Sequence, residues 1–277
     1  MANKRSILQP QFDIMLPYWG DVELFEQTVE SVLAQTNPNW RLYISDDHYP
    51  SLDAKKYIEA LKDKRITYFR HPKNIGITSN FNHCIEQARA PYCMIVGCDD
   101  KLLPNYVETA LQNIGDADFY QPGVQVINVE GDIYLPLGDK VKRQLMPKKS
   151  GVYTGEKLAT SLCHGNWLYF PSIAWKTSTL QRYLFESKYK IVEDLDLELR
   201  MIMDGATLAF DTTPTFQYRR FNESLSSKEK GKNGVRFAEE KAAYLYFAQE
   251  FAHIGWKKAS RAAKLHITSR LNKLISR

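Results

Sequence analysis

Apolar and polar positions along the first half of the chain form a repeating pattern of strands and helices. Between the first two apolar runs, Phe25, Val29 and Val32 recur at helical spacing, and Asp21 stands where a helix-capping residue belongs. The apolar runs with the length of buried strands occupy residues 12–16, 41–45, 65–69 and 92–96. Strands that alternate with helices predict an α/β fold with a Rossmann-like, mostly parallel sheet flanked by helices.

The pattern is less regular in the second half of the chain. From Gly234 the periodicity is helical almost to the last residue. Before that point we expect strands at 119–129 and 207–211, a loop rich in glycine and lysine at 138–151, an aromatic-rich segment at 166–175 and a helix at 193–203. The chain should therefore end in a helical extension of the α/β domain.

Size and composition favour one large domain. With 277 residues, 44% of them apolar, the chain has enough material for a full hydrophobic core. No apolar stretch approaches the roughly 18–20 residues that span a bilayer, and no apolar segment follows the charged N-terminus, so we expect a cytoplasmic protein. The cysteines form no CxxC pair, which suits reduced packing residues; they are Cys84, Cys93, Cys98 and Cys163.

The positive charge of the chain is concentrated at its C-terminal end. The formal net charge is +5, and every charged residue after Glu250 is basic. Aliphatic residues recur among these basic residues at roughly helical spacing: Leu265, Ile267, Leu271, Leu274 and Ile275. Two interpretations stay open, a basic helix packed on the domain or a peripheral contact with the anionic inner face of a membrane. Because the body of the chain carries no basic excess, we expect no nucleic-acid partner.

Two pairs of acidic residues follow strands of the predicted sheet. Asp46 and Asp47 come directly after the second strand, and Asp99 and Asp100 come shortly after the fourth. The carboxyl ends of parallel strands share one edge of the sheet, which is where open α/β sheets bind ligands. Clustered carboxylates suit a hard divalent cation such as Mg²⁺ or Mn²⁺. Ordinary turn chemistry also places aspartate at strand ends and is the alternative explanation.

Two common classes of nucleotide-binding protein lack their motifs here. The first strand is followed by the run PYWGD at residues 17–21, which contains no GxGxxG, and the chain has no GxxxxGK[ST]. A dinucleotide-dependent dehydrogenase and a P-loop site are therefore poorly supported. The same run lacks the glycine-rich basic loop with which a sugar-1-phosphate nucleotidyltransferase would hold a triphosphate.

Several motifs together resemble the family 2 glycosyltransferases of the GT-A fold. In chain order they are Leu16-Pro17-Tyr18, the segment SVLAQTNPNW at 31–40, Asp46-Asp47, Asn74-Ile75-Gly76, Asn80-Phe81-Asn82 and Gly97-Cys98-Asp99-Asp100. Their order and spacing match the family from residue 12 to about 105. Further matches to the family's acidic and late basic segments are Glu193-Asp194 with Arg200, and Tyr218-Arg219-Arg220 with Ser224 to Ser226.

The resemblance implies a division of the chain into three parts. Residues 1–11 would form a flexible N-terminus, and residues 12–227 would form a single GT-A catalytic domain. Within that domain, residues 12–115 would be the nucleotide-binding half and residues 116–227 the acceptor-binding half. Residues 228–277 would form the basic C-terminal helical extension.

The resemblance also implies roles on the nucleotide side of the site. Asp47, with Asp46 beside it, would contact the nucleobase and the ribose, and Pro17 and Tyr18 would line the base pocket. The residues that shape the rest of the nucleotide cleft would be Asn74, Gly76 and Asn82.

Three carboxylates would hold the metal and carry the chemistry. Asp99 would hold Mn²⁺ or Mg²⁺ across the diphosphate, supported by Asp100. Asp194, beside Glu193, would be the general base that takes the proton of the acceptor hydroxyl as its oxygen attacks the anomeric carbon. Acidic residues at a helix N-terminus are also favoured by the helix dipole alone, which is the structural alternative for this pair.

Two positions depart from the family pattern. Gly97 stands where the family's metal motif usually begins with an aspartate, and Phe221 stands where a histidine often follows the late arginines. Arg219 and Arg220 would then carry more of the diphosphate charge, unless they are a solvated pair at a strand end. Trp167 is left with two interpretations, stacking on a sugar ring or filling the core.

The resemblance as a whole predicts a metal-dependent, inverting glycosyltransferase. It would move a sugar from a nucleoside-diphosphate sugar, most often a UDP-sugar in this family, to the hydroxyl of a glycan or lipid-linked acceptor. Such an enzyme would serve cell-surface polysaccharide or glycoconjugate synthesis. The alternatives are a non-catalytic sugar-nucleotide-binding protein and the nucleotidyltransferase named above.

Overall fold

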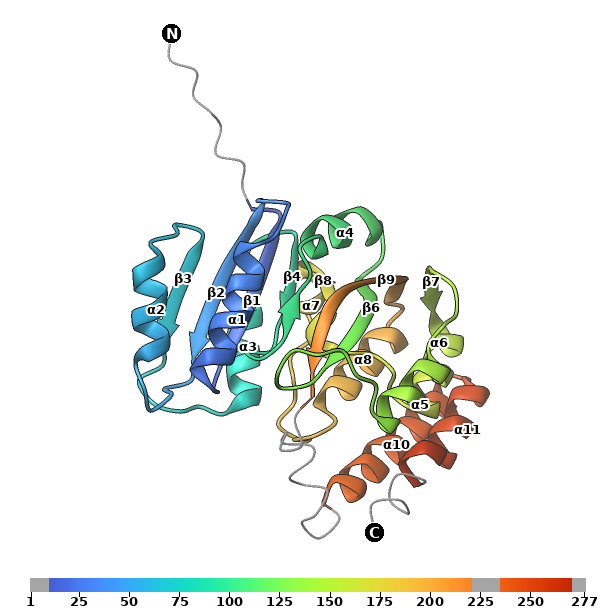
Figure 1. Ribbon diagram of the computed structural model, residues 1–277. Coiled ribbons are helices and arrows are strands. Elements are labelled where there is room, and N and C mark those ends of the chain that lie inside the picture. Colours follow the sequence, from blue (N-terminus) through green and yellow to red (C-terminus); the bar gives the residue numbers. More distant parts are fainter. Residues whose placement is uncertain (1–9, 221–234, 271–277) are drawn as a thin grey trace.

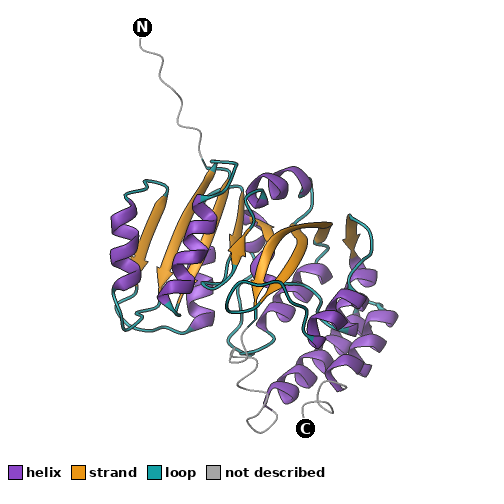
Figure 2. Ribbon diagram, in the orientation of Figure 1, coloured by secondary structure: helices purple, strands orange, loops and turns teal. Residues whose placement is uncertain are grey.

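The computed structural model describes residues 10–220 and 235–270. Within these ranges the chain forms one nine-stranded sheet with helices packed on both faces, and the last helices gather at one end of the molecule (Figures 1 and 2). Several features expected from the sequence lie outside the described residues: Phe221, Ser224 to Ser226, the boundary at 227 and the aliphatic residues Leu271, Leu274 and Ile275.

The first four long strands form a parallel half of the sheet. They are β1 (Phe12–Tyr18), β2 (Trp40–Asp46), β3 (Ile66–Arg70) and β4 (Tyr92–Ile95). β1 pairs in parallel with β2 and with β4, and β3 pairs in parallel with β2. Ile14 and Leu16 belong to one core cluster and Met15 to the other, because side chains alternate along a strand that is covered on both faces.

Helices cover both faces of this parallel half. They are α1 (Val22–Leu33), α2 (Asp53–Leu61), α3 (Ile77–Gln87) and α4 (Tyr106–Asn113). The buried residues of α1, α2 and α4 share a core cluster with Ile14, whereas those of α3 join the cluster of Met15. Asp21 caps α1 as expected, since its Oδ1 accepts the Glu23 N–H at 2.8 Å. The α/β arrangement predicted for the first half is confirmed.

The second half of the sheet has mixed strand directions. Its strands are β5 (Lys101–Leu102), β6 (Phe119–Ile127), β7 (Gly151–Thr154), β8 (Ala174–Lys176) and β9 (Thr207–Arg219). β8 joins the halves by pairing antiparallel with both β4 and β6, and β6 and β9 are parallel. β9 continues well beyond the strand expected at 207–211, and most of the segment 166–175 is irregular, with a 3₁₀ turn at Phe170–Ser172.

The helices of the second half are α5 (Leu137–Leu145), α6 (Gly155–His164), α7 (Thr177–Leu180), α8 (Glu193–Met203), α10 (Val235–His253) and α11 (Lys257–Leu265). α5 corrects the loop expected at 138–151. The pattern of apolar residues did not predict this helix, because Asp139 is its buried residue while Leu137 and Val141 are exposed. The predicted C-terminal helices are present and pack on α6 and α8. No helix of the described residues is long and apolar enough to cross a membrane.

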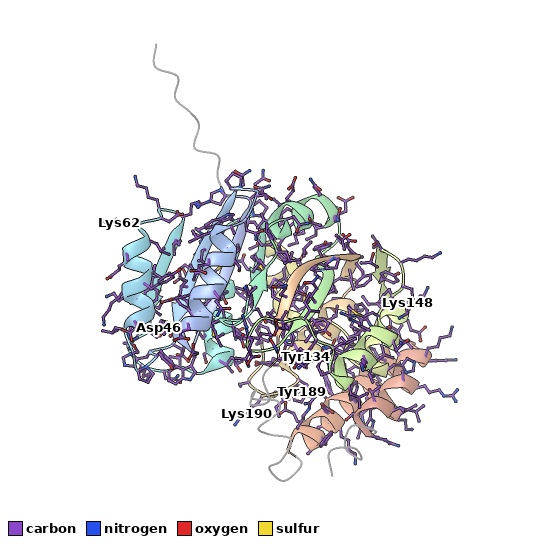
Figure 3. The ribbon with its side chains drawn as sticks, in the orientation of Figure 1. Asp46, Lys62, Tyr134, Lys148, Tyr189 and Lys190 are labelled. Carbon is purple, nitrogen blue, oxygen red and sulfur yellow. The ribbon has the colours of Figure 1, made fainter. Side chains whose placement is uncertain are left out.

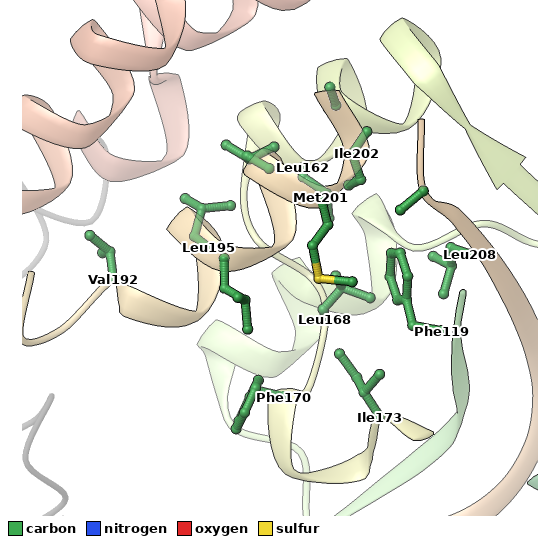
Figure 4. Packing of buried hydrophobic residues seen from close by; sticks show 14 of the residues in the cluster. Phe119, Leu162, Leu168, Phe170, Ile173, Val192, Leu195, Met201, Ile202 and Leu208 are labelled. Atoms are coloured by element: carbon green, nitrogen blue, oxygen red, sulfur yellow. The ribbon is translucent and has the colours of Figure 1, made fainter. Parts of the chain in front are cut away.

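The position of α8 is set by the larger core cluster. Leu195, Met201 and Ile202 of α8 are buried in the same cluster as Phe119 of β6 and Leu168 (Figure 4). Apolar side chains of α10 complete the cluster from the C-terminal side. This packing holds the N-terminus of α8, where Glu193 and Asp194 lie, in one place relative to the sheet.

Asp13 is a buried charge on the central strand and the basis of a stability prediction. Its carboxylate forms an ion pair with Arg41 at 2.8 Å and accepts the Ala90 N–H at 2.8 Å. Asp13→Ala should lower the free energy of unfolding by about 3–5 kcal/mol, because it leaves the buried Ala90 N–H without its acceptor and removes the ion-pair partner of Arg41. Urea unfolding measures the loss. The control Glu59→Ala, which removes the exposed partner of Lys55, should cost less than about 1 kcal/mol, and an equal cost in both variants would contradict the prediction.

Candidate active site

The loops after β1, β2 and β4 meet at one edge of the sheet. A Cβ added at Gly20, after β1, would lie 2.9 Å from Sγ of Cys98, after β4. The Asp47 N–H, after β2, donates to the Tyr18 carbonyl at 3.1 Å. Figure 3 shows Asp46 and Tyr134, which follows β6, toward the same lower edge of the molecule. The acidic pairs therefore share the edge where open α/β sheets bind ligands.

Asp46 is fully buried and its carboxylate is used within the protein. Oδ2 accepts the Tyr68 hydroxyl at 2.6 Å and pairs with Arg70. Oδ1 accepts the Tyr49 N–H at 2.7 Å. The structure thus corrects the expected contact of this carboxylate with the nucleotide: Asp46 holds the loop around Tyr49.

Asp47 ties together residues that the sequence had suggested separately. Its Oδ1 accepts the Ile75 N–H at 2.6 Å and its Oδ2 accepts the Gly76 N–H at 3.0 Å. The Asn74 amide donates to the Asp47 carbonyl at 3.2 Å. Gly76 has φ of +85°, a left-handed conformation that favours glycine, so the tight turn before α3 explains its presence. These residues therefore lie together at this edge of the sheet.

Aromatic residues surround the end of β1, and the sequence singled out only one of them. Tyr18 is 1% exposed, its hydroxyl donates to the Gly20 carbonyl at 3.1 Å, and its ring packs on Phe25, so it belongs to the core rather than to an open base pocket. Pro17 is half-buried. Trp19 is 50% exposed and meets Tyr49 edge-to-face at 5.4 Å between ring centroids. A large exposed aromatic directly after a central strand was the signal that could have identified it.

Asp99 and Asp100 face one common space. A Cβ at Gly97 would lie 2.7 Å from Asp100 Oδ2 and 2.9 Å from Asp99 Oδ1, so both oxygens converge above the glycine. Burial raises the pKa of Asp99 to about 6. Burial, with the charge of Asp99, raises the pKa of Asp100 well above its usual range. A divalent cation would relieve this repulsion.

These two carboxylates suit a cation shared with a phosphate ligand. Among the described residues no group of three or more His, Cys, Asp or Glu side chains converges as a metal site. Mg²⁺ and similar ions are often bound by one or two carboxylates together with substrate phosphates, without a complete protein cage. Asp99 and Asp100 fit that kind of site.

Gly97 leaves the room that the two carboxylates occupy. Gly97→Ala should raise the Mn²⁺ concentration needed for half-maximal activity by about tenfold, because the added Cβ displaces both oxygens. Titration of activity with Mn²⁺ checks this. Gly138→Ala is the control, since its Cβ would meet nothing within 4 Å. An unchanged Mn²⁺ requirement in Gly97→Ala would show that these oxygens do not hold the cation.

Arg219 is a buried structural residue, which corrects its expected contact with the diphosphate. It is 2% exposed. Its Nε donates to the Asp99 carbonyl at 2.7 Å, and its Nη2 donates to Gln27 at 2.8 Å. Its backbone N–H donates to Oδ1 of Asp100 at 2.8 Å. Arg219 therefore holds the loop that carries the candidate metal ligands.

Arg220 is paired with an acidic residue from α5. Its guanidinium forms two hydrogen bonds to Asp139, at 2.9 and 3.0 Å, and its side chain stays 25% exposed. The Tyr169 hydroxyl donates to the same carboxylate at 2.7 Å. Arg220 is thus not a residue that meets only solvent, and its expected contact with the diphosphate stays a prediction. Its charge still lowers the pKa of Asp100.

Glu193 and Asp194 begin α8 and differ in their surroundings. Glu193 is buried and accepts the Thr78 hydroxyl at 2.7 Å, and burial raises its pKa to about 7. Asp194 is half-buried, and its Oδ1 accepts the Leu195 N–H at 2.8 Å. Among the described residues no other side chain donates a hydrogen bond to the Asp194 carboxylate. Burial raises the pKa of Asp194, as a general base near neutral pH requires.

Hydrogen bonds from α3 and α10 hold the segment that precedes α8. Asn82 of α3 donates to the Phe185 carbonyl at 3.0 Å and accepts the Phe185 N–H at 2.8 Å. Its expected role in shaping the nucleotide cleft stays a prediction. Glu239 of α10 accepts the backbone N–H groups of Lys190 and Val192 with one oxygen, at 2.9 and 3.1 Å. The C-terminal helices therefore help to position Asp194.

Lys142 of α5 links these charged groups and was not identified from the sequence. Its Nζ donates to the Leu168 carbonyl at 2.8 Å and lies 4.4 Å from the centroid of the Tyr169 ring. Burial, and then the charge of Arg220, lower the pKa of Lys142 to about 8. The Lys142 charge in turn lowers the pKa of Asp194. Charged groups on α5, at the end of β9 and at the start of α8 thus shift one another's pKa.

Removal of the Lys142 charge should change the pH dependence of the glycosyl transfer that the sequence predicts. In Lys142→Met the pKa of Asp194 should rise, so the acid limb of kcat/KM should move to higher pH. Lys142→Arg keeps the charge and should keep the limb near its wild-type place. Nucleotide release measured between about pH 5 and pH 9 tests both variants. A limb that stays in place in Lys142→Met would show that this charge does not act on the base.

Trp167 belongs to the core, which decides between its two interpretations and corrects its place among the expected substrate-binding residues. It is 0% exposed, and its Nε1 donates to the Ser161 hydroxyl at 3.0 Å. Its ring meets Phe210 edge-to-face with 5.6 Å between centroids. No face of the indole is open to a sugar ring.

Sequence comparisons identify the proteins that this chain resembles. The model of the family described as glycosyl transferase family 2 matches residues 13–178. The putative colanic acid biosynthesis glycosyl transferase WcaA of Escherichia coli K12 is 29% identical over 206 residues, covering 70% of this chain and 67% of WcaA. The putative glycosyltransferase EpsE of Bacillus subtilis 168 is 26% identical over 203 residues, covering 71% of this chain and 68% of EpsE.

Two solved structures have a similar fold. S. aureus TarS 1–349 in complex with UDP-GlcNAc aligns with a TM-score of 0.66 and 12% identity, over 85% of this chain and 66% of that one. The mannosyltransferase PcManGT from Pyrobaculum calidifontis, in complex with GDP-Man and Mn²⁺, aligns with a TM-score of 0.63 and 13% identity, over 98% of this chain and 74% of that one. These structures support the GT-A fold, and the family match covers more than half of the chain. The chain belongs to glycosyl transferase family 2.

Proposed function

We propose that this glycosyltransferase is inverting and metal-dependent. The observation that carries the proposal is that the candidate metal ligands and the candidate general base both lie near the late basic segment. Asp99 and Asp100 converge above Gly97, and Asp194 presents a half-buried carboxylate at the start of α8. Arg220 and Lys142 connect the two electrostatically.

The chemistry of the chain's own residues follows from this placement. Asp194 takes the proton of the acceptor hydroxyl, and the oxygen attacks the anomeric carbon from the face opposite the diphosphate. One displacement of this kind inverts the anomeric centre. Asp99 and Asp100 would hold Mn²⁺ or Mg²⁺, which when bound neutralises charge on the departing diphosphate. Arg219 keeps the loop of Asp99 and Asp100 in position.

The donor is a nucleoside-diphosphate sugar, and we propose a UDP-sugar. TarS is recorded with UDP-GlcNAc and PcManGT with GDP-Man, so both nucleotides occur on this fold. In this chain, residues 12–115 would hold the nucleotide and residues 116–227 the acceptor. The exposed ring of Trp19, next to Tyr49, offers a face for the base.

The acceptor is a glycan or a lipid-linked glycan of a cell-surface polysaccharide or glycoconjugate. The name of WcaA, which places it in colanic acid biosynthesis, supports a polysaccharide product. We propose that the protein acts in the cytoplasm, at the inner face of the membrane. The four free thiols suit that reducing compartment.

Incubation with a panel of nucleotide sugars tests the proposal directly. The protein with Mn²⁺ or Mg²⁺ should slowly release the nucleoside diphosphate from one donor, and chelation should stop the release. An acceptor that gives a product of inverted anomeric configuration would complete the assignment. Binding of a donor without release, even with candidate acceptors, would instead favour a non-catalytic sugar-nucleotide-binding protein.

A further inference from the structure

Helix α5 buries one acidic residue and exposes two apolar ones. Asp139 is 1% exposed and paired with Arg220, whereas Leu137 and Val141 are 64% and 42% exposed. Leu137 and Val141 lie one helical turn apart, so they form a single outward face. A surface helix of a protein that meets only water has the opposite arrangement. The outer face of α5 therefore has the character of a contact surface.

The exposed apolar residues extend beyond the helix and have basic neighbours. Ile133 and Tyr134, just before α5, are 62% and 37% exposed. Together with Leu137 and Val141 we call them the α5 surface. Exposed basic side chains on and after the helix are Lys140, Arg143, Lys148 and Lys149. Among the described residues none of these four forms an ion pair, and the exposed acids nearby in sequence are Glu130 and Asp132 in the preceding turn.

The inner face of the same helix belongs to the candidate active site. Asp139 binds Arg220, and the charge of Lys142 acts on Asp194. A helix is about 10 Å across, and Leu137 and Val141 are exposed where Asp139 is buried, so these two residues of the α5 surface lie on the side of the helix away from the site. Whatever contacts the α5 surface is therefore held close to the acceptor side of the site.

A second basic face lies on α11. Its alanines Ala259, Ala262 and Ala263 are buried, and its exposed basic residues are Lys257, Lys258, Arg261 and Lys264. The end of α5 lies near the segment that follows α11, because Leu145 Cδ1 and Thr268 Oγ1 lie 2.7 and 3.0 Å from a Cβ built on Gly165. Exposed basic side chains therefore lie on both α5 and α11.

We propose that the α5 surface is the site at which this protein docks on an anionic lipid bilayer. Exposed aliphatic and tyrosine side chains enter the headgroup region while lysine and arginine contact the lipid phosphates, which is the chemistry of interfacial binding. The proposal rests on the proposed transfer to a membrane-linked acceptor. Docking through α5 would bring that acceptor to Asp194 without a membrane-spanning segment.

Vesicle flotation tests the proposal with the full chain. Wild type should float with vesicles of mixed phosphatidylcholine and phosphatidylglycerol, and much less with phosphatidylcholine alone. Leu137→Glu/Val141→Glu should weaken binding by at least about tenfold, because both apolar contacts are lost. Lys140→Glu/Arg143→Glu should weaken it by roughly tenfold or more, with a smaller salt dependence. The matched controls Val152→Glu, 67% exposed on the edge strand β7, and Lys64→Glu, exposed before β3, should bind as wild type does.

Release of nucleoside diphosphate from a soluble donor separates this proposal from the proposed function. The α5 variants should keep that release, which also shows that they are folded. Absence of flotation in wild type, or flotation that survives in Leu137→Glu/Val141→Glu, would overturn the docking proposal while leaving the transferase assignment intact. Wild type that binds DNA as tightly as anionic vesicles would also overturn it, because binding would then depend on charge alone.

Discussion

Asp194→Asn is expected to lower kcat of the transferase by about 10²–10⁴-fold while leaving donor affinity unchanged. The amide keeps the shape of the side chain and the hydrogen bond from the Leu195 N–H, but it accepts no proton from the acceptor hydroxyl. Steady-state kinetics with the donor identified by the panel, together with donor binding by calorimetry, measure both quantities.

The pH dependence supplies an independent check on Asp194. Burial raises the pKa of this carboxyl, and only its ionised form acts as a base, so activity should be low at acid pH and rise through the raised pKa. That limb should vanish in Asp194→Asn. The control Asp204→Asn makes the same change at the exposed C-terminal end of α8 and should keep both rate and limb. Wild-type rates in Asp194→Asn would exclude this residue as the base.

Asp99→Asn is expected to lower the metal-dependent rate by about 10²–10³-fold. The substitution removes one of the two carboxylates that converge above Gly97, and with it the charge that would hold a divalent cation. Mn²⁺ should raise Tm of the wild-type protein, because a ligand that binds only the folded state stabilises it by mass action. In Asp99→Asn that shift should be lost or strongly reduced. Thermal unfolding with and without Mn²⁺, beside the rate assay, measures both effects.

Stability without metal distinguishes loss of a ligand from loss of the fold. The pKa of Asp99 is raised in the folded protein, so its ionised form destabilises the fold at neutral pH, and removal of the charge should leave Tm equal or higher. Asp116→Asn, at an exposed position, is the matched control and should change neither Tm nor the Mn²⁺ response. A Mn²⁺-dependent rise in Tm that persists in Asp99→Asn would place the cation elsewhere.

The parallel half of the fold was predictable because local and tertiary preferences agree there. β1 to β4 are apolar runs covered on both faces, and α1 and α3 turn regular apolar stripes toward them. In the second half this agreement fails. β9 continues through exposed residues up to Arg219, and the aromatic segment at 166–175 is buried without being a long strand.

At the candidate site, the sequence predicted which residues lie together better than it predicted what each residue does. The motifs indicated that Asp47, Asn74 and Gly76 belong together, and one carboxylate with two backbone N–H groups joins them. They did not indicate that Asp46 and Arg219 are fully bonded within the protein, because the partners Arg70, Gln27 and Asn128 are distant in the chain. Lys142 was missed for the same reason, since its neighbours come from β9 and α8.

The sequence by itself determined the family, the α/β class and the edge of the sheet where the acidic pairs lie. These depend on periodicity and on short motifs, which are local properties of the chain. Only the tertiary structure decided which charged groups are available and which are consumed in ion pairs, because burial and distant partners set the state of each group. α5 shows the difference most clearly. Its sequence pattern is that of a loop. In the folded protein Asp139 is buried and paired with Arg220, and Leu137 and Val141 face outward.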